Sequence, residues 1–404
     1  MQDNEKKPAL RFKGFTDPWE QRKVGDHLIP SKLPGHTGVD ARKLTVKLWG
    51  KGVVEKTDSY GGSEHTQYYV RHAGQFMYGK LDFLHAAFGI VPAELDNYES
   101  TLDSPAFDLS EINGKFLVSR VCKEDFYLKY GTIANGSRKA KRIHEDTFMD
   151  MPILVPELEE QERVAALLEA LDTLITLHQR KYEKLVNIKK SMLDKMFPKN
   201  GASVPEIRFK GFTDPWEQRK LSEVATFGGG HTPPMADPDN YEDGYVLWVT
   251  SQDVKSNYLD RTTTQITEKG AKELTLYPAG SLVMVTRSGI LRHTLPVAEL
   301  RKPSTVNQDI RVILPQGECC GEWLLQFFIS HNKELLLEFG KTGTTVESVD
   351  FGKIKDMLLY MPSTVEQQQI GDFFAKLDSL ITLHQRKLEL LQNIKKSLLD
   401  KMFA

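Results

Sequence analysis

Residues 157–197 read ELEEQERVAALLEALDTLITLHQRKYEKLVNIKKSMLDKMF, and this stretch contains neither glycine nor proline. Its apolar side chains recur at alternating spacings of four and three residues, the heptad pattern with which a long helix buries one stripe against another helix. His178 and Lys189 interrupt the stripe. The stretch predicts a single helix, about 60 Å long at a rise of about 1.5 Å per residue. The residues that we expect to pair it with a partner helix are Leu168, Leu171, Ile175, Tyr182 and Leu185.

The same pattern returns near the end of the chain, displaced by 206 residues. The sequence ITLHQRK occupies residues 175–181 and 381–387, and NIKKS occupies residues 187–191 and 393–397. Two matched stripes of this kind predict two helices that pack on each other. In the second copy the expected pairing residues are Phe374, Leu377, Ile381, Leu388 and Leu391.

Charge is distributed unevenly along each predicted helix. Residues 157–172 carry six acids and one base, whereas residues 173–199 carry two acids and seven bases. The second copy has the same bias. An antiparallel arrangement would bring the acidic start of one helix beside the basic end of the other. Because an exposed ion pair contributes only roughly a few tenths of a kcal/mol, this complementarity would set orientation more than stability.

A second repeat divides the chain into tandem halves. The sequence RFKGFTDPWEQRK at residues 11–23 is identical to that at residues 208–220. Within it, the order Asp17, Pro18, Glu20 has the pattern of a helix start, but a docking turn is the interpretation that we favour. From the two repeats we predict five segments. They are a docking segment (1–23), a first variable domain (24–155), a central long helix (156–199), a second variable domain (200–361, opening with the repeated docking segment 200–220) and a C-terminal long helix (362–404).

The variable regions have unlike sequences, each with short apolar runs between turn signals. Five runs predict strands, at residues 67–70, 115–118, 245–250, 281–286 and 310–314. Residues 322–339 predict one helix that Gly340 ends. The fold class that follows is mixed α/β (α+β): two globular domains joined by two long antiparallel coiled-coil helices, in a pseudo-twofold tandem repeat.

Composition excludes several classes of protein. The 404 residues are 40% hydrophobic and 27% charged, which is typical of globular domains rather than disordered or fibrous chains. No apolar run approaches the roughly 20 residues that cross a bilayer, and three cysteines are too few for a disulfide framework. We therefore expect a cytoplasmic protein. A net charge of −2 argues against non-specific coating of nucleic acid, but it permits a reader of DNA with local basic patches.

No catalytic or metal-binding pattern stands out, so we expect no cofactor in this chain. The run Gly340, Lys341, Thr342 resembles the end of a phosphate-binding loop, but Leu335 occupies the position where that loop needs glycine. Residues 232–235 (TPPM) lack the acid or amide and the aromatic residue of an amino-methyltransferase element. The eleven histidines do not have metal-ligand spacing with cysteines or carboxylates.

The variable regions are instead rich in loop side chains that suit base edges and phosphates. At any single position a solvated surface role is the alternative. In the first region the candidate DNA-binding residues are Arg71, Gln75, Tyr78, Lys80, Ser137, Arg138, Lys139, Lys141 and Arg142. In the second region they are His231, Thr232, Thr250, Ser251, Gln252, Arg287, Ser288, Arg292, His293, Asn307, Gln308, Lys341, Thr342, Thr344 and Thr345.

This layout resembles the DNA-specificity subunit of type I restriction–modification enzymes. The resemblance covers nearly the whole chain and is most specific in the doubled helices. The matching helix residues are Pro156, Glu160, Gln161, Leu171, Asp172, Leu174 and Ile175, with Pro362, Glu366, Gln367, Leu377, Asp378, Leu380 and Ile381. The second variable region adds the family-like segments 248–250 (WVT), 307–309 (NQD) and 343–345 (GTT).

The resemblance implies that each variable domain reads one half of a bipartite, asymmetric sequence in double-stranded DNA. It implies that the helices set the spacing of the halves and dock two methyltransferase subunits. These partners would bind S-adenosylmethionine and methylate adenine at N6, and separate motor–nuclease subunits would use ATP and Mg²⁺. The specificity subunit itself would have no catalytic residue.

Two other functions remain open at this point. The first is a self-contained DNA methyltransferase or nuclease, which the missing cofactor motifs argue against. The second is a coiled-coil scaffold without a DNA function, which would not need two such unlike variable regions. Labelled S-adenosylmethionine incubated with DNA would identify the enzyme, and half-site-specific binding would exclude the scaffold.

Overall fold

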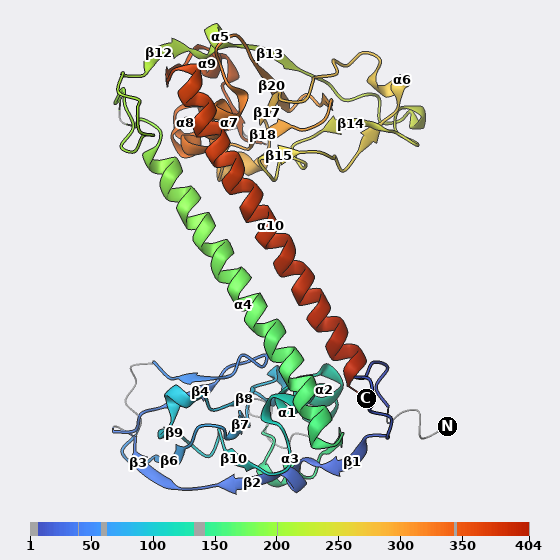
Figure 1. Ribbon diagram of the computed structural model, residues 1–404. Helices are drawn as coiled ribbons and strands as arrows, with labels where there is room; N and C mark the ends of the chain where they lie inside the picture. Colours follow the sequence, from blue (N-terminus) through green and yellow to red (C-terminus); the bar gives the residue numbers. More distant parts are fainter. Residues whose placement is uncertain are drawn as a thin grey trace. The chain divides into compact units, whose positions relative to one another are not determined.

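The computed structural model describes residues 7–38, 40–57, 63–132, 142–199, 201–342 and 346–403. The chain divides into two compact units. The first comprises Met1–Gln179 with Arg386–Ala404, and the second comprises Arg180–Gln385. Figure 1 traces the chain through its elements. Within the described ranges, no helix combines the length and the apolar character that a membrane crossing requires.

Both predicted long helices are present. Helix α4 spans Leu158–Lys195 and helix α10 spans Thr364–Met402 (Figure 1). In the first unit the end of α10 packs on the start of α4, where Met402 and Leu168 share one buried cluster. In the second unit the start of α10 packs beside the end of α4, where the ring centroids of Phe374 and Phe197 lie 6.1 Å apart. The helices are therefore antiparallel in each unit, as predicted.

The heptad stripes account for which side of each helix is covered. Among the ten expected pairing residues, Leu168, Leu171, Phe374 and Leu377 are buried, and the remaining six are half-buried. Leucines off the stripe, such as Leu174 at 43% and Leu380 at 44%, are exposed. The apolar spacing therefore selects the contact face of both helices.

The repeated docking segment forms a strand rather than a helix start. Strand β1 (Glu20–Lys23) pairs antiparallel with β11 (Pro152–Val155), and β12 (Glu217–Lys220) pairs antiparallel with β23 (Leu358–Met361). The helix-start interpretation was wrong because each segment runs directly beside the strand that precedes a long helix and completes its hydrogen bonds there. The favoured interpretation, a docking segment, agrees with these contacts.

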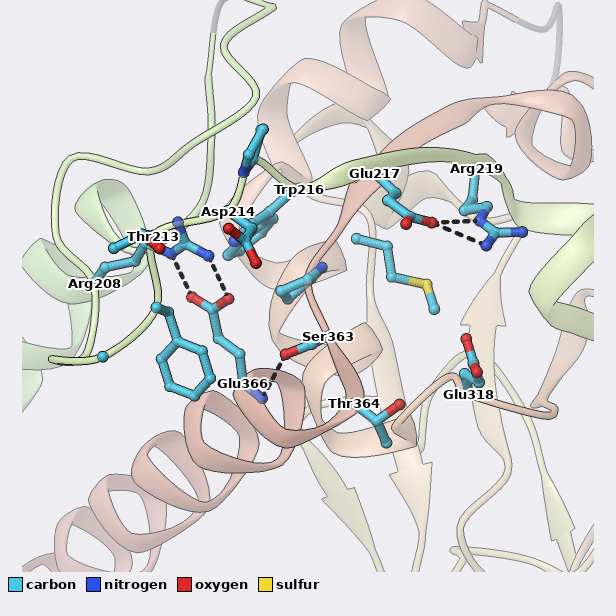
Figure 2. Close-up of a pocket in the computed structure, with 15 residues that line it drawn as sticks. Arg208, Thr213, Asp214, Trp216, Glu217, Arg219, Glu318, Ser363, Thr364 and Glu366 are labelled. Atoms are coloured by element: carbon cyan, nitrogen blue, oxygen red, sulfur yellow. Dashed lines mark hydrogen bonds and ion pairs between the residues drawn. The ribbon is translucent and has the colours of Figure 1, made fainter.

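A buried ion pair fastens each docking segment to the first turn of its long helix. Arg208 donates through Nε and Nη2 to the two Glu366 oxygens, at 2.7 Å each (Figure 2). Arg11 binds Glu160 in the same way, at 2.8 and 2.6 Å. Since Glu160 and Glu366 are each only 1% exposed, these bidentate pairs fix the segment on the helix. We call residues 11–23, residues 208–220 and the two long helices the frame.

The first unit is built on an antiparallel sheet in the order β2-β10-β7-β8. Its strands are β2 (Leu28–Ser31), β10 (Ala106–Leu109), β7 (Phe76–Tyr78) and β8 (Phe88–Ile90). A second sheet joins β3 (Pro34–Thr37), β6 (Gln67–Arg71) and β9 (Tyr98–Ser100), and a hairpin joins β4 (Leu44–Val46) and β5 (Val53–Glu55). Three short helices follow, α1 (Gly114–Val121), α2 (Glu124–Gly131) and α3 (Glu145–Met149).

The second unit repeats this plan with an added strand, in the order β13-β20-β17-β18-β15. Its strands are β13 (Ala225–Gly229), β20 (Ile310–Pro315), β17 (Leu282–Val285), β18 (Val297–Leu300) and β15 (Tyr258–Leu259). A smaller sheet joins β16 (Gln265–Ile266), β14 (Val246–Val249) and β19 (Thr305–Val306), and a hairpin joins β21 (Gly340–Lys341) and β22 (Ser348–Val349). Helices α7 (Gly321–Ser330), α8 (Asn332–Phe339) and α9 (Phe351–Asp356) correspond in order to α1, α2 and α3.

Most strand predictions are confirmed, and two element predictions are corrected. Residues 115–118 lie in helix α1, because the Asn113 side chain caps it by accepting from the amides of Lys115 and Phe116 at 3.0 and 3.1 Å. The predicted helix at 322–339 is two helices that break at His331, whose ring nitrogen lies 3.0 Å from the Pro198 carbonyl oxygen. A short apolar run does not reveal either feature without its tertiary partner.

Candidate nucleic-acid interface

The polar segments of the second unit converge at one edge of its sheets. Strand pairing joins Gly229 to Arg311 and Val285 to Ile310, so β13 and β17 end where β20 begins. Parallel pairing of Val249 with Val306 makes β14 and β19 end together. We call the residues that follow these strand ends, 229–232, 250–252, 286–288 and 307–309, the second-unit rim. The rim contains nine of the candidate DNA-binding residues, namely His231, Thr232, Thr250, Ser251, Gln252, Arg287, Ser288, Asn307 and Gln308.

Hydrogen bonds tie the rim segments to one another. The Thr232 hydroxyl donates to Gln308 Oε1 at 2.5 Å. The amide and hydroxyl of Thr286 donate to the Asp309 carbonyl oxygen at 2.8 and 3.0 Å. Segments separated by up to about 75 residues in the sequence are thereby held as one surface, as a preorganised reader requires.

The nine rim candidates differ in exposure, and four of them are half-buried, namely Thr232, Thr250, Ser251 and Ser288. His231, Gln252, Arg287 and Gln308 are exposed and can reach a ligand. Asn307 is only 6% exposed and its Oδ1 accepts from the Asp309 amide at 3.1 Å, so its side chain shapes the turn. Asn307 is therefore corrected from a base contact to a residue that supports the rim.

The β21–β22 hairpin adjoins the rim. The Val349 amide donates to the Thr286 carbonyl oxygen at 3.0 Å, and the Ser288 amide donates to the Glu347 carbonyl oxygen at 3.1 Å. Lys341 and Thr342 are exposed on this hairpin. Thr344 and Thr345 lie outside the described residues.

Two candidates next to the rim have other surroundings. Arg292 forms an ion pair with Glu347, and this guanidinium holds the pKa of that carboxyl below its usual range. His293 lines a cavity of about 1170 Å³ beside α4, together with Lys190 and Leu193. His293 therefore borders α4 and is not among the residues that follow the strand ends.

Four predicted DNA contacts in the first unit are buried and are corrected. Arg71, Gln75, Tyr78 and Lys80 are 0, 2, 0 and 8% exposed. Arg71 donates to Ser100 Oγ at 2.7 Å and to the Ser31 carbonyl oxygen at 2.8 Å. Burial lowers the pKa of Arg71 to about 10. Such side chains hold strands together and cannot reach a base edge.

The partners of the other three residues are also internal. Gln75 Nε2 donates to Asp108 Oδ1 at 2.9 Å, the Tyr78 hydroxyl donates to the Ile143 carbonyl oxygen at 3.0 Å, and Lys80 Nζ donates to Glu145 Oε1 at 2.9 Å. Burial raises the pKa of Tyr78 above its ordinary value. The sequence alone does not distinguish these buried polar side chains, which have hydrogen-bond partners inside the domain, from polar side chains on the surface.

In the order of the chain, the basic run of the first unit lies between α2 and α3, as the β21–β22 hairpin lies between α8 and α9. At its end, the Ile143 amide donates to the carbonyl oxygen of Lys80, shortly after β7, much as Val349 binds Thr286 after β17. Arg142 forms an ion pair with Asp103 at 3.3 Å. Ser137, Arg138, Lys139 and Lys141 lie outside the described residues.

Sequence reasoning missed Lys32, which directly follows β2 and therefore matches the rim position after β13. Its Nζ lies 3.2 Å from Glu145, and its side chain is 57% exposed. The signal that could have found it is topological, because β2 and β13 occupy the same place in the two sheets.

Comparison with known proteins points to one family over part of the chain. Residues 213–393 match the family model of the type I restriction modification DNA specificity domain. This part of the chain is therefore similar to that family's specificity domain. A specificity subunit of type I restriction enzyme EcoR124I/EcoR124II from Escherichia coli is 30% identical over 166 residues, which are 41% of each chain. The MjaIX specificity subunit of Methanocaldococcus jannaschii is 28% identical over 193 residues, 46% of this chain and 44% of that one.

The matches to these curated specificity subunits thus cover less than half of their length. A solved structure supports the fold over a longer span. The S subunit of a type I restriction–modification system from M. genitalium has a TM-score of 0.63 and 12% identity, covering 98% of this chain and 99% of that one. This similarity shows a shared fold along nearly the whole chain.

Proposed function

We propose that this chain is the non-catalytic DNA sequence-specificity subunit of a type I restriction–modification complex, in which each unit reads one half of a bipartite, asymmetric DNA target. The observation that carries the proposal is a single sheet plan built twice on a repeated frame, with variable regions whose sequences differ between the two units. At one edge of this plan the second unit presents the exposed polar residues of its rim, and in the first unit the exposed Lys32 follows the matching strand. A protein that reads two unlike half-sites needs this combination of constant support and variable surface.

The exposed rim residues have the chemistry of base readers. Glutamine pairs in a bidentate manner with adenine and arginine with guanine in the major groove. Gln252, Gln308 and Arg287 offer these groups at the second-unit rim. The hydrogen-bonded rim would place them, and lysines such as Lys341 would contact phosphates, which position the protein without specifying sequence.

The doubled frame also suggests the partners. Two identical docking segments and two nearly identical helices offer the same surface twice, which suits two copies of one methyltransferase subunit. In this proposal those subunits bind S-adenosylmethionine and methylate adenine, and motor–nuclease subunits bind ATP and Mg²⁺. The partners would supply much of the phosphate contact, since this chain has a net charge of only −2.

Long-read methylation sequencing tests the proposal in cells that carry the partner methyltransferase, with and without this gene. We expect a bipartite N6-methyladenine motif that appears only when the gene is present. Unchanged methylation with intact binding to the methyltransferase would contradict the role in specificity. A mobility-shift titration then tests the phosphate argument, because tight specific binding by the isolated chain would refute it.

A further inference from the structure

Two aspartates at equivalent positions of the repeat each bind a lysine from the opposite long helix. Lys395 Nζ on α10 lies 2.5 Å from Asp172 Oδ1 on α4 in the first unit. Lys189 Nζ on α4 lies 2.6 Å from Asp378 Oδ1 on α10 in the second. These lysines are two of the residues that interrupt the heptad stripes. Each lysine interruption is therefore an ion pair that crosses the helix pair.

The second oxygen of each aspartate is turned toward the globular part of its own unit. Lys115 Nζ, on α1, donates to Asp172 Oδ2 at 2.5 Å. Asn257 Nδ2, just before β15, donates to Asp378 Oδ2 at 3.0 Å. Each carboxylate thus ties together two long helices and one globular domain, and we call these two sites the first and second joints.

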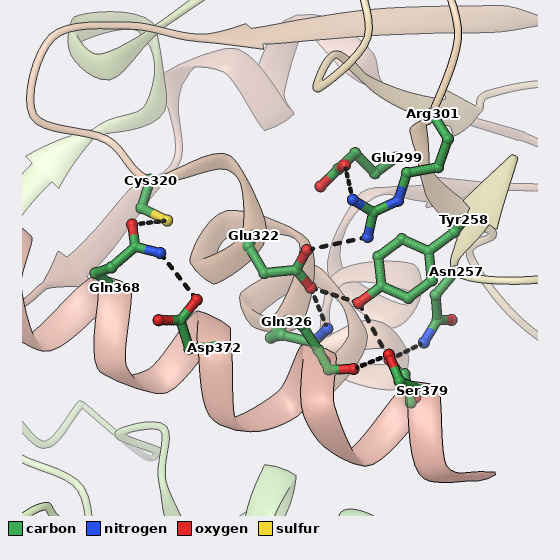
Figure 3. Close-up of polar contacts among 12 residues, drawn as sticks. Asn257, Tyr258, Glu299, Arg301, Cys320, Glu322, Gln326, Gln368, Asp372 and Ser379 are labelled. Carbon is green, nitrogen blue, oxygen red and sulfur yellow. Dashed lines mark hydrogen bonds and ion pairs between the residues drawn. The ribbon is translucent and has the colours of Figure 1, made fainter. Parts of the chain in front are cut away.

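The second joint is drier and more extended than the first. The side chains of Lys189 and Asp378 are 11% and 12% exposed, whereas those of Lys115 and Asp172 are 29% and 33% exposed. Figure 3 shows the network beyond Asn257, where Tyr258 donates to Glu322 at 2.5 Å. Arg301 in turn lies 3.0 Å from Glu299 and 3.6 Å from Glu322. Because breaking a buried pair leaves a charge without a partner, disruption should cost more at the second joint.

A shift of the helices along each other would separate both lysines from their aspartates and leave charged groups at apolar stripe positions. A polar residue in a heptad stripe is the best-attested device for fixing helix register. We propose that Asp172 and Asp378 are positioning residues that set how each recognition domain is held on the helix pair. Through this they would set the number of base pairs between the half-sites that the complex reads. The inference deepens the proposed function and rests on it.

The residue that each aspartate binds in its globular domain differs in charge between the two joints, and this difference makes a sharp test possible. Asn257 is neutral and can accept from a cation through its Oδ1, whereas Lys115 can only donate. Exchanging charges as Asp378→Lys with Lys189→Asp should therefore rebuild the second joint. The same exchange as Asp172→Lys with Lys395→Asp should fail, because Lys115 would face the new lysine. Adding Lys115→Glu should then rescue the first joint.

The experiment measures methylation by the assembled complex on DNA with the preferred spacer and with spacers one base pair shorter or longer. We expect Asp378→Ala to change the ratio of the rate on the preferred spacer to the rate on the altered spacers by about tenfold. Asp172→Ala should change this ratio less. The second-joint exchange should restore the original ratio, whereas the first-joint exchange should restore it only when Lys115→Glu is added. Asp372→Ala is the matched control, since Asp372 is exposed on the same helix and binds only Gln368 among the described contacts. This control should keep the original ratio.

An equal fall in rate on every spacer, with a lowered melting temperature, would show a purely structural role and overturn the inference. An unchanged spacer profile in Asp378→Ala would also overturn it. A wild-type complex that methylates no bipartite site would overturn the proposed function instead. In that case amide hydrogen exchange at residues 257–259 would test whether Asp378 holds this segment on the helix pair. Faster exchange in Asp378→Ala than in the wild type would support this role, and equal exchange would reject it.

Discussion

At the residue scale, two arginines show how the fold assigns opposite roles to the same side chain. Arg71 is completely buried between strands, and its guanidinium binds Ser100 and the Ser31 carbonyl oxygen. Arg287 is exposed at the second-unit rim. The sequence offers both as DNA contacts, and only the packing around them separates a structural group from a reader.

Substitution of the two arginines should have opposite signatures. Arg71→Ala leaves a cavity and removes the hydrogen bonds to Ser100 and to the Ser31 carbonyl oxygen, so it should lower the free energy of unfolding by about 3 kcal/mol. Arg287→Ala should leave stability unchanged but weaken binding of the cognate half-site about tenfold. Urea unfolding and fluorescence anisotropy of the assembled complex on DNA measure the two effects. Loss of stability in Arg287→Ala would contradict its assignment to the rim.

Glu299 predicts a pH dependence of stability. Burial, helped by the adjacent Glu322 carboxylate and opposed by Arg301, raises the pKa of Glu299 from 4.5 to about 7. Between pH 4.5 and 7 the folded chain therefore binds a proton that the unfolded chain has released. Stability should fall as pH rises through this window and stay lower above it.

The variant Glu299→Gln removes this titration. Its free energy of unfolding should vary less with pH between 4.5 and 7 than that of the wild type, as urea unfolding at a series of pH values would measure. Glu268→Gln is a suitable control, since Glu268 is exposed and should keep the wild-type slope. Parallel curves for wild type and Glu299→Gln would reject the assignment.

At the element scale, the helix stripe should tolerate charge only outside the contact face. Leu171 and Leu377 are each 8% exposed. Their replacement by lysine places unpaired charges between the helices, which should loosen the pair and abolish docking of the methyltransferase. Copurification with that partner measures the effect. Leu174→Lys and Leu380→Lys are the matched controls, because these leucines are exposed. Loss of docking in the controls alone would refute the assignment of Leu171 and Leu377 to the contact face.

The elements also show what sequence could and could not predict. Heptad spacing over residues 157–197 defines both the helix and its contact face, because periodicity over such a length has only one interpretation. The sequence predicts a strand at residues 115–118 (KFLV) because three consecutive apolar residues are too few to show a period. The burial of Arg71, Gln75, Tyr78 and Lys80 depends on strands distant in sequence, so no local pattern reports it. The rim depends on the pairing of β13 with β20, which brings residues 229 and 311 together although they are distant in the sequence.

At the scale of the whole molecule, the two units should be separable in specificity. Replacing residues 24–155 with the corresponding region of another family member should change one half of the methylated sequence and leave the other half unchanged. The physical reason is that the frame contacts of the second unit, such as Arg208 with Glu366, remain intact. Methylation sequencing reads the result, and a change in both halves would refute the model of two readers.

The glutamine at the start of each long helix has a consequence for evolution. Gln161 Oε1 accepts from the main-chain amide of Asn113 at 2.9 Å, and Gln367 Oε1 accepts from that of Cys320 at 2.8 Å. Neither glutamine oxygen binds a side chain in these contacts, and asparagine and cysteine serve equally. Any residue except proline can supply this amide hydrogen. The glutamine therefore holds a recognition domain through its main chain and does not depend on which side chain stands there. A recognition domain can thus change its sequence by mutation and keep its attachment to the long helix.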